Sequence, residues 1–136
     1  ARFKGSEAAL AFTSGYTANV GVISALCHKD TVIFSDALNH ASIIDGCRLA
    51  RGLTAVYVHN DMDDLLKKVR HFRPRQGFIV TDSVFSMDGD IARLPDLVAM
   101  AREHGRTAGA GDYAGAAGGG GRRGTGRHDP LSRKHG

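Results

Sequence analysis

Short apolar runs and longer amphipathic segments alternate along this 136-residue chain. A short apolar run bounded by polar or turn-forming residues is typical of a buried strand. The run at residues 31–34, Thr-Val-Ile-Phe, is continuously β-branched and aromatic, which is the pattern of a strand covered on both faces. The apolar runs therefore predict four strands, at residues 7–12, 31–34, 54–58 and 78–81.

The segments between these runs have the periodicity of helices. Val20, Ile23 and Leu26 recur on one helical face. Acidic residues begin the third such segment at Asp61, where they interact favourably with a helix dipole, and Pro74 closes that segment. Strand alternating with helix predicts an α/β fold of three layers, a mostly parallel sheet with helices on both faces. The predicted helices lie at residues 16–26, 41–51, 61–73 and 94–104.

A polar loop at residues 35–46 follows the second predicted strand and leads directly into a helix. Open α/β sheets bind their ligands in the crevice beyond the carboxyl ends of the strands, which is where this loop begins. Its imidazole, His40, is therefore a candidate site residue. The alternative is that His40 caps the helix that starts near Ala41, and the residues alone leave both interpretations open.

The motif Ser14-Gly15-Tyr16 stands where the first predicted strand turns into a helix. Open backbone N–H groups and the helix dipole favour a phosphate at such a point, and Gly15 permits close approach of the backbone. An ordinary turn is the alternative interpretation. The Gly-Lys-Ser/Thr ending of a P-loop is absent from this stretch.

A third polar stretch, residues 81–90, follows the last predicted strand and contains Ser86. From the residues alone, Ser86 is interpreted as a turn hydroxyl, because turn-forming residues follow it. Asp88 and Asp90 are interpreted as structural and are not assigned as a general acid and base. We expect a role in fixing the loops for a further set of polar residues: Asp36, Asn39, Ser42, Asp45 and Asp82.

Taken together, three stretches of this chain resemble the α-oxoamine synthase family of pyridoxal-phosphate enzymes. They are residues 13–19 (Thr-Ser-Gly-Tyr-Thr-Ala-Asn), residues 35–46 (Ser-Asp-Ala-Leu-Asn-His-Ala-Ser-Ile-Ile-Asp-Gly) and residues 81–90 (Thr-Asp-Ser-Val-Phe-Ser-Met-Asp-Gly-Asp). The resemblance runs from about Arg2 to Gly105, and three motifs at coherent spacing are more specific than one. It implies part of the large domain of the pyridoxal-phosphate-dependent transferase fold, in an enzyme that is a homodimer when complete.

The resemblance also implies roles for individual residues. His40 matches the catalytic histidine that stacks on the ring of pyridoxal 5'-phosphate and contributes to binding the amino-acid substrate. Gly15 and Tyr16 would bind the cofactor's phosphate, and Ser86 matches the serine that hydrogen-bonds the cofactor near its ring oxygen. Asp112 lies within one residue of the place of the aspartate that pairs with the pyridine nitrogen, but the His of the family's Asp-x-Ala-His motif is absent here.

The last 31 residues depart from the family's pattern. They contain ten glycines and no strand-like apolar run, so they cannot bury enough surface to offset the entropy of ordering. We expect residues 1–105 to be the amino-terminal half of the cofactor-binding large domain, and residues 106–136 to be a Gly/Arg-rich tail that is disordered or frame-shifted. The family's cofactor-binding lysine would lie beyond Gly136, so this chain alone is expected to be inactive.

Charge and cysteine content narrow the classes of partner. The net charge of +4 arises in the tail, since residues 1–105 hold 12 Lys/Arg against 12 Asp/Glu, and residues 106–136 hold 6 against 2. Nucleic acid is therefore not an expected partner. Cys27 and Cys47 lack the spacing of a metal site or disulfide framework, and no apolar run approaches the roughly 18 residues of a membrane span. We expect a cytoplasmic protein with reduced thiols that binds small-molecule substrates, without metal or membrane.

The reaction implied by the resemblance is the condensation of an amino acid with an acyl thioester, with loss of carbon dioxide. Residues 45–49 and 82–90 favour the branch of the family that joins L-alanine to a pimeloyl thioester in biotin biosynthesis. Glycine C-acetyltransferase shares the loop at residues 36–46 almost as well and is the alternative within the family. A non-catalytic α/β fragment or nucleotide-binding module is the alternative of a different class, although a Gly-x-Gly-x-x-Gly motif after a strand is absent.

Overall fold

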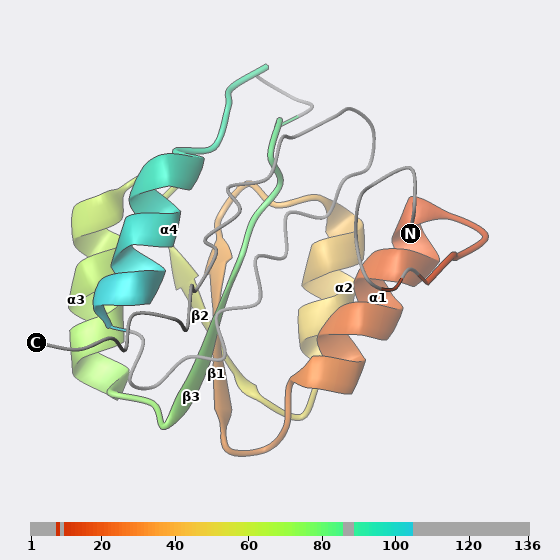
Figure 1. Ribbon diagram of the computed structural model, residues 1–136, viewed down its shortest axis with the longest axis horizontal. Helices are drawn as coiled ribbons and strands as arrows, with labels where there is room; N and C mark the ends of the chain where they lie inside the picture. The colour runs from red at the N-terminus through yellow and green to blue at the C-terminus, as the bar shows by residue number, and fades with distance from the viewer. Residues whose placement is uncertain (1–7, 9, 86–88, 105–136) are drawn as a thin grey trace, which may run out of the picture.

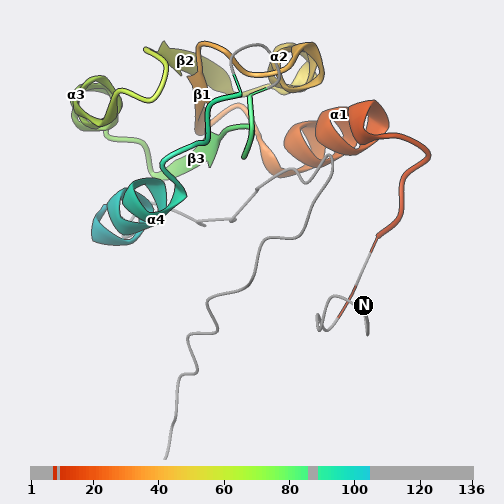
Figure 2. The same ribbon diagram turned by 90° about the horizontal axis from the view of Figure 1, so that it is seen from above.

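The computed structural model describes residue 8, residues 10–85 and residues 89–104. Helices α1 and α2 cover one face of a sheet, and α3 and α4 cover the other (Figure 1, Figure 2). The expected α/β fold of three layers is thus confirmed. The elements in chain order are α1 (Gly15–Leu26), β1 (Thr31–Asp36), α2 (Ala41–Leu49), β2 (Leu53–Tyr57), α3 (Met62–Phe72), β3 (Gln76–Val80) and α4 (Leu94–Glu103).

The sheet has the strand order β2-β1-β3, and both pairings are parallel. Phe34 of the central strand β1 stands between Ala55 of β2 and Ile79 of β3. All six residues of β1 are buried, which confirms the expectation of a strand covered on both faces. Because the strands are parallel, the loops that follow them leave the sheet at one edge.

The strand expected at residues 7–12 is wrong over the part that the structure describes. Ala8 and residues 10–12 lie in no strand and are exposed, and 79% of Leu10 is accessible to solvent. A strand is stabilised by pairing with a neighbour, and a short apolar run does not by itself supply one. The described part of the sheet therefore has three strands.

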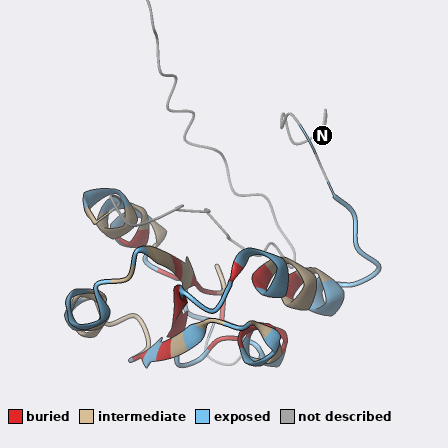
Figure 3. Cartoon of the chain, turned by 90° about the horizontal axis from the view of Figure 1, so that it is seen from below, coloured by how far each residue is buried: buried red, intermediate tan, exposed pale blue. Residues whose placement is uncertain are grey.

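Successive side chains of β1 point to opposite faces of the sheet and belong to two hydrophobic clusters, one on each face. Val32 and Phe34 pack on the side of α3 and α4, with Leu65 and Leu97. Ile33 packs on the other side, under α1 and α2. Figure 3 shows the buried residues gathered on the strands and on the sides of the helices that face them. The second cluster consists of Ile23, Cys27, Ile33, Ile43, Cys47, Phe78 and Val80.

Helices α1 and α2 approach closely at Gly46. A Cβ atom at this position would lie 2.9 Å from Ile23 Cδ1 and 3.2 Å from the backbone oxygen of Asn19. The buried residues of α1 are accordingly Asn19 and Ile23. The expected apolar face is partly wrong, because Leu26 is 44% exposed and a polar residue, Asn19, takes a buried place.

The ends of the helices follow local sequence signals. Asp61 caps α3, since its carboxylate accepts the N–H groups of Asp63 and Asp64, as the acidic start predicted. Helix α2 ends at Leu49 rather than residue 51, and at Gly52 a Cβ atom would meet the Thr31 carbonyl oxygen at 2.8 Å. Within the described ranges, no helix is long and apolar enough to cross a bilayer. Residues 105–136 lie outside the described residues, so the division of the chain at residue 105 stays a prediction.

Candidate functional site

The candidate site begins at the edge of the sheet where the three parallel strands end. Asp36, the last residue of β1, is level with Tyr57 of β2, and Ser35 is level with Val80 of β3. The loops that follow these strands therefore start side by side, although they lie more than twenty residues apart in the sequence. Open α/β sheets bind their ligands beyond this end of their strands.

Asn39 joins two of these loops. Its amide nitrogen donates to Ser35 Oγ at 2.9 Å and to the Val80 carbonyl at 2.8 Å. Its amide oxygen accepts the backbone N–H of Asp82 at 2.9 Å. Because Asn39 is buried, these three hydrogen bonds satisfy its side chain and tie the loop after β1 to the loop after β3.

His40 follows Asn39 and caps α2. Its backbone N–H donates to Asp82 Oδ2 at 2.7 Å, and its Nδ1 accepts the backbone N–H of Ser42 at 3.1 Å. Nδ1 is therefore an acceptor, so the neutral ring carries its proton on Nε2. The residue is exposed at the edge of the sheet. The capping alternative is thus confirmed, and it leaves the ring accessible to a ligand.

Two contacts bring the start of α1 to the start of α2. The buried Asn19 donates to Ser42 Oγ at 2.8 Å, and the same hydroxyl lies 2.7 Å from Nδ1 of His40. Tyr16 donates its phenolic hydrogen to Asp45 Oδ2 at 2.9 Å, and this hydrogen bond raises the pKa of Tyr16. The structure therefore brings Tyr16 and His40, two of the predicted site residues, to neighbouring helix ends.

The start of α1 has the form of a capping box. Ser14 is the N-cap, its hydroxyl accepts the N–H of Thr17 at 3.1 Å, and the Thr17 hydroxyl accepts the N–H of Ser14 at 3.1 Å. Gly15 and Tyr16 are the first two residues of the helix, whose N–H groups have no acceptor within a helix. N–H groups of this kind can bind an anion, and the phosphate expected at Gly15 and Tyr16 stays a prediction.

Two predicted site residues, Ser86 and Asp112, lie outside the described residues. Among the residues expected to fix the loops, Asp36, Asn39, Ser42, Asp45 and Asp82 all make hydrogen bonds that hold the edge together.

A second polar group at this edge was missed by the sequence analysis. Nδ1 of His59 lies 2.9 Å from Oδ1 of the buried Asp36, and its Nε2 lies 3.3 Å from Oδ2 of Asp90. Hydrogen bonding to Asp36 is the main cause that raises the pKa of His59, and Asp90 adds to it. The signal that could have found this residue is the one that selected His40, a histidine just after a predicted strand.

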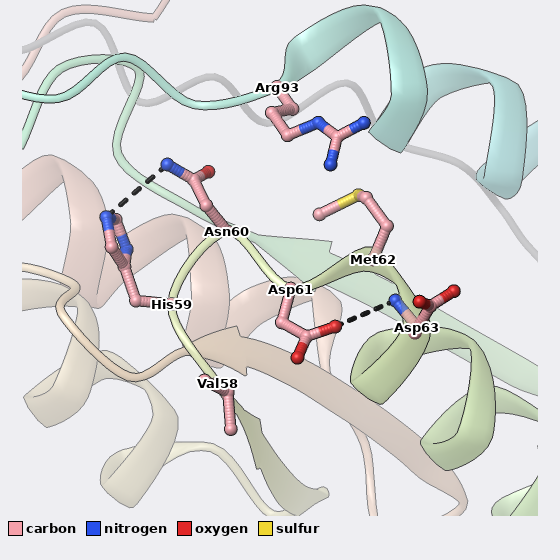
Figure 4. Close-up of a pocket in the computed structure, with 7 residues that line it drawn as sticks. All are labelled: Val58, His59, Asn60, Asp61, Met62, Asp63 and Arg93. Atoms are coloured by element: carbon pink, nitrogen blue, oxygen red, sulfur yellow. Dashed lines mark hydrogen bonds between the residues drawn. The ribbon is translucent and has the colours of Figure 1, made fainter.

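An open pocket of about 530 Å³ lies beside His59, between the loop after β2 and the start of α4. Figure 4 shows His59 and Asn60 at one end of it and Met62 and Arg93 at the other. Its lining contains none of the predicted cofactor-binding residues that the structure describes, which are Gly15, Tyr16 and His40. The pocket is therefore a feature separate from the exposed edge around His40.

Comparison with known protein families identifies the family of this chain. Residues 1–107 match the model of the aminotransferase class I and II family. The chain belongs to this family. The expected likeness to pyridoxal-phosphate enzymes is confirmed by this match and by the relatives and solved structures that follow.

Curated relatives with high identity carry one name. A Desulfovibrio desulfuricans protein with the provisional name 8-amino-7-oxononanoate synthase is 81% identical over 107 residues, which are 79% of this chain and 28% of that protein. The 8-amino-7-oxononanoate synthase of Lysinibacillus sphaericus is 59% identical over 105 residues, 76% of this chain and 27% of that enzyme. The chain thus spans little more than a quarter of the length of these relatives.

Solved structures with the same fold are also pyridoxal-phosphate-dependent transferase fold enzymes. A serine palmitoyltransferase variant from S. paucimobilis with a bound PLP-myriocin aldimine has a TM-score of 0.73 and 39% identity, over 79% of this chain and 27% of that chain. The Francisella tularensis 8-amino-7-oxononanoate synthase has a TM-score of 0.60 and 34% identity, over 73% of this chain and 28% of that chain. The predicted fold is therefore confirmed.

Proposed function

We propose that this chain supplies the amino-terminal half of the cofactor-binding domain of an 8-amino-7-oxononanoate synthase. The activity is a pyridoxal-phosphate-dependent condensation of L-alanine with a pimeloyl thioester, with loss of carbon dioxide, in biotin biosynthesis. The observation that carries the proposal is the 81% identity to the Desulfovibrio relative over 107 residues, which are 79% of this chain. A homodimer in the cytoplasm is part of the same proposal.

The described residues fit pyridoxal phosphate. The N–H groups of Gly15 and Tyr16 at the start of α1 suit its phosphate. The exposed ring of His40, held through Nδ1, offers a flat surface at the same edge. These two features are joined through Asn19 and Ser42, which supports one binding region rather than two.

Each residue then has a defined task. Gly15 and Tyr16 hold the phosphate, and His40 covers the cofactor ring and contacts the amino-acid substrate. Ser86 is proposed to hydrogen-bond the cofactor, and Asp112 to pair with its ring nitrogen, on the resemblance alone. When bound, pyridoxal phosphate supplies the electron sink for the electron pair released at the α-carbon of the amino acid.

Genetic complementation tests the proposal. In a hybrid enzyme, residues 1–105 of this chain replace the matching segment of the Lysinibacillus sphaericus enzyme. The hybrid is expressed in a bacterium that lacks 8-amino-7-oxononanoate synthase. We expect the hybrid to restore growth without biotin, as the unmodified enzyme does. A hybrid that accumulates as folded protein but leaves the strain dependent on biotin would contradict the proposal and favour glycine C-acetyltransferase or a non-catalytic role.

A further inference from the structure

The carboxylate of Asp36 is the most buried charged group at the edge of the sheet, with 1% of its side chain exposed. Its Oδ1 accepts the backbone N–H of Leu38 at 2.9 Å, and its Oδ2 accepts the backbone N–H of Asn60 at 3.0 Å. The two backbone donors fix the position of this carboxylate at the end of β1.

His59 lies between the carboxylates of Asp36 and Asp90. Each ring nitrogen faces a carboxylate oxygen, Nδ1 facing Asp36 at 2.9 Å and Nε2 facing Asp90 at 3.3 Å. A neutral imidazole has one N–H group, whereas both contacts are hydrogen bonds only when both nitrogens carry hydrogen. The neutral alternative would leave Nε2 to accept from Asn60 Nδ2, at 3.4 Å, with the Asp90 carboxylate still beside it.

The same imidazole touches the turn that follows β3. Its ring packs edge to face on Phe85, with 4.4 Å between the ring centroids. Phe85 and Asp90 are joined by a backbone hydrogen bond of 2.8 Å, and Gly89 donates to the Phe85 carbonyl at 3.0 Å. His59 therefore contacts both described ends of this turn, Phe85 through its ring and Asp90 through Nε2.

We infer that His59 is a positioning residue whose protonated ring holds two described residues, Phe85 and Asp90, against the ends of β1 and β2. Protonation closes two ion pairs at once, to a buried carboxylate on β1 and to a half-exposed one on the turn. Loss of the proton opens the contact with Asp90 first, because Asp36 is fixed by two backbone N–H groups and Asp90 is more exposed. The consequence for the cofactor rests on the proposed function, which assigns the cofactor-binding Ser86 to this turn.

The direction of the pH dependence follows from the charges around the ring. Asp36 and Asp90 contact it, Asp61 and Asp63 line the adjoining pocket, and Arg93 lies across that pocket with its guanidinium paired to Asp96. A raised pKa means that the ion pairs are complete below the ordinary value of 6.5 and are lost as the pH rises through the raised value. Asp90 is therefore held at pH values below the raised pKa of His59 and released above it.

Nuclear magnetic resonance of the full 136-residue chain tests this without any cofactor. The ring signals of His59, identified by their loss in His59→Gln, are followed against pH together with the amide signals of Gly89 and Ile91. We expect His59 to titrate above the ordinary value of 6.5 and the two amides to report the same midpoint. Asp90→Asn should shift that midpoint downward, whereas the control Asp30→Asn, a turn residue of the α1–β1 connection, should leave it unchanged.

Three results would overturn the inference. They are a His59 midpoint at or below 6.5, a midpoint that Asp90→Asn leaves in place, and amide signals that do not follow the ring. In the hybrid enzyme, the affinity for pyridoxal phosphate should fall with rising pH at the His59 midpoint, and this step should move in Asp90→Asn. If the ring and the amides titrate together but the affinity for pyridoxal phosphate shows no such step, the positioning role of His59 stands and the proposed cofactor contact of Ser86 fails.

Discussion

Replacement of Asn39 by alanine should destabilise the fold more than its small loss of volume suggests. The substitution removes three hydrogen bonds, to Ser35 Oγ, to the Val80 carbonyl and from the N–H of Asp82. A hydrogen bond contributes about 1 kcal/mol net, so the three together amount to about 3 kcal/mol. The Val80 carbonyl and the Asp82 N–H would also be left without their Asn39 partner. A backbone polar group without a partner adds to the loss of stability.

Urea unfolding followed by circular dichroism measures this loss as a change in the free energy of unfolding. Asn39→Asp is the diagnostic variant, because it keeps the shape and the acceptor oxygen but replaces the donor that reaches Ser35 and Val80. We expect Asn39→Asp to be at least as unstable as Asn39→Ala at pH 7, since its charge would face the Val80 carbonyl. Ser24→Ala is the control, an exposed helix residue for which we expect a change within about 0.5 kcal/mol.

A loss below about 1 kcal/mol in Asn39→Ala would refute the reasoning, because one average hydrogen bond would then account for the whole effect. An Asn39→Asp variant as stable as the original chain would refute it as well. That result would mean that the volume of the side chain, rather than its N–H donors, holds the two loops together.

The remaining predictions concern backbone packing, the site and acid stability. Gly52→Ala should lower the free energy of unfolding by about 1 to 3 kcal/mol, because its Cβ would meet a backbone oxygen at 2.8 Å; an unchanged urea midpoint would count against the close approach. In the hybrid enzyme, His40→Ala should weaken binding of the cofactor or amino acid and slow turnover, whereas His28→Ala, at the far end of α1, should do little; equal effects would remove His40 from the site. Hydrogen bonding to Lys68 lowers the pKa of Asp64 from 3.8. The stability that ionised Asp64 gives to the folded chain is therefore complete above that pH and is lost as the pH falls through the lowered value. The stability difference between the original chain and Asp64→Asn, measured by urea unfolding, should therefore shrink in acid, and a constant difference would contradict the assignment.

The layers of the fold could be predicted from the sequence because they depend on local patterns. The run Val32-Ile33-Phe34 has no polar residue to place on a solvent face, and it became the central strand with every residue buried. Asp61 and the acidic residues after it predicted the start of α3 for a reason that acts within one turn. The run at residues 7–12 is also apolar, but it contains three alanines and no β-branched residue, a composition that favours a strand less. Its described residues have no pairing partner in the sheet, and composition does not reveal a partner.

The site could be predicted only in part, because most of its contacts join residues that are far apart in the sequence. His40 was selected from its place after a strand, and the structure puts it at the start of α2. Its connection to α1 through Asn19 and Ser42 depends on how two helices pack, and the sequence analysis considered only the apolar residues on one face of the first helix. His59 was missed because its importance comes from Asp36 and Asp90, residues 23 and 31 positions away.

Competition between amino acids in the purified hybrid enzyme tests the central proposal most directly. Equal concentrations of L-alanine, glycine and L-serine are supplied with a pimeloyl thioester, and the products are separated by mass. A single methyl group changes specificity by about tenfold or more, so the account predicts that the alanine product exceeds the glycine product by at least that factor. A glycine or serine product that equals or exceeds the alanine product, from a hybrid whose unmodified parent prefers alanine, would contradict it.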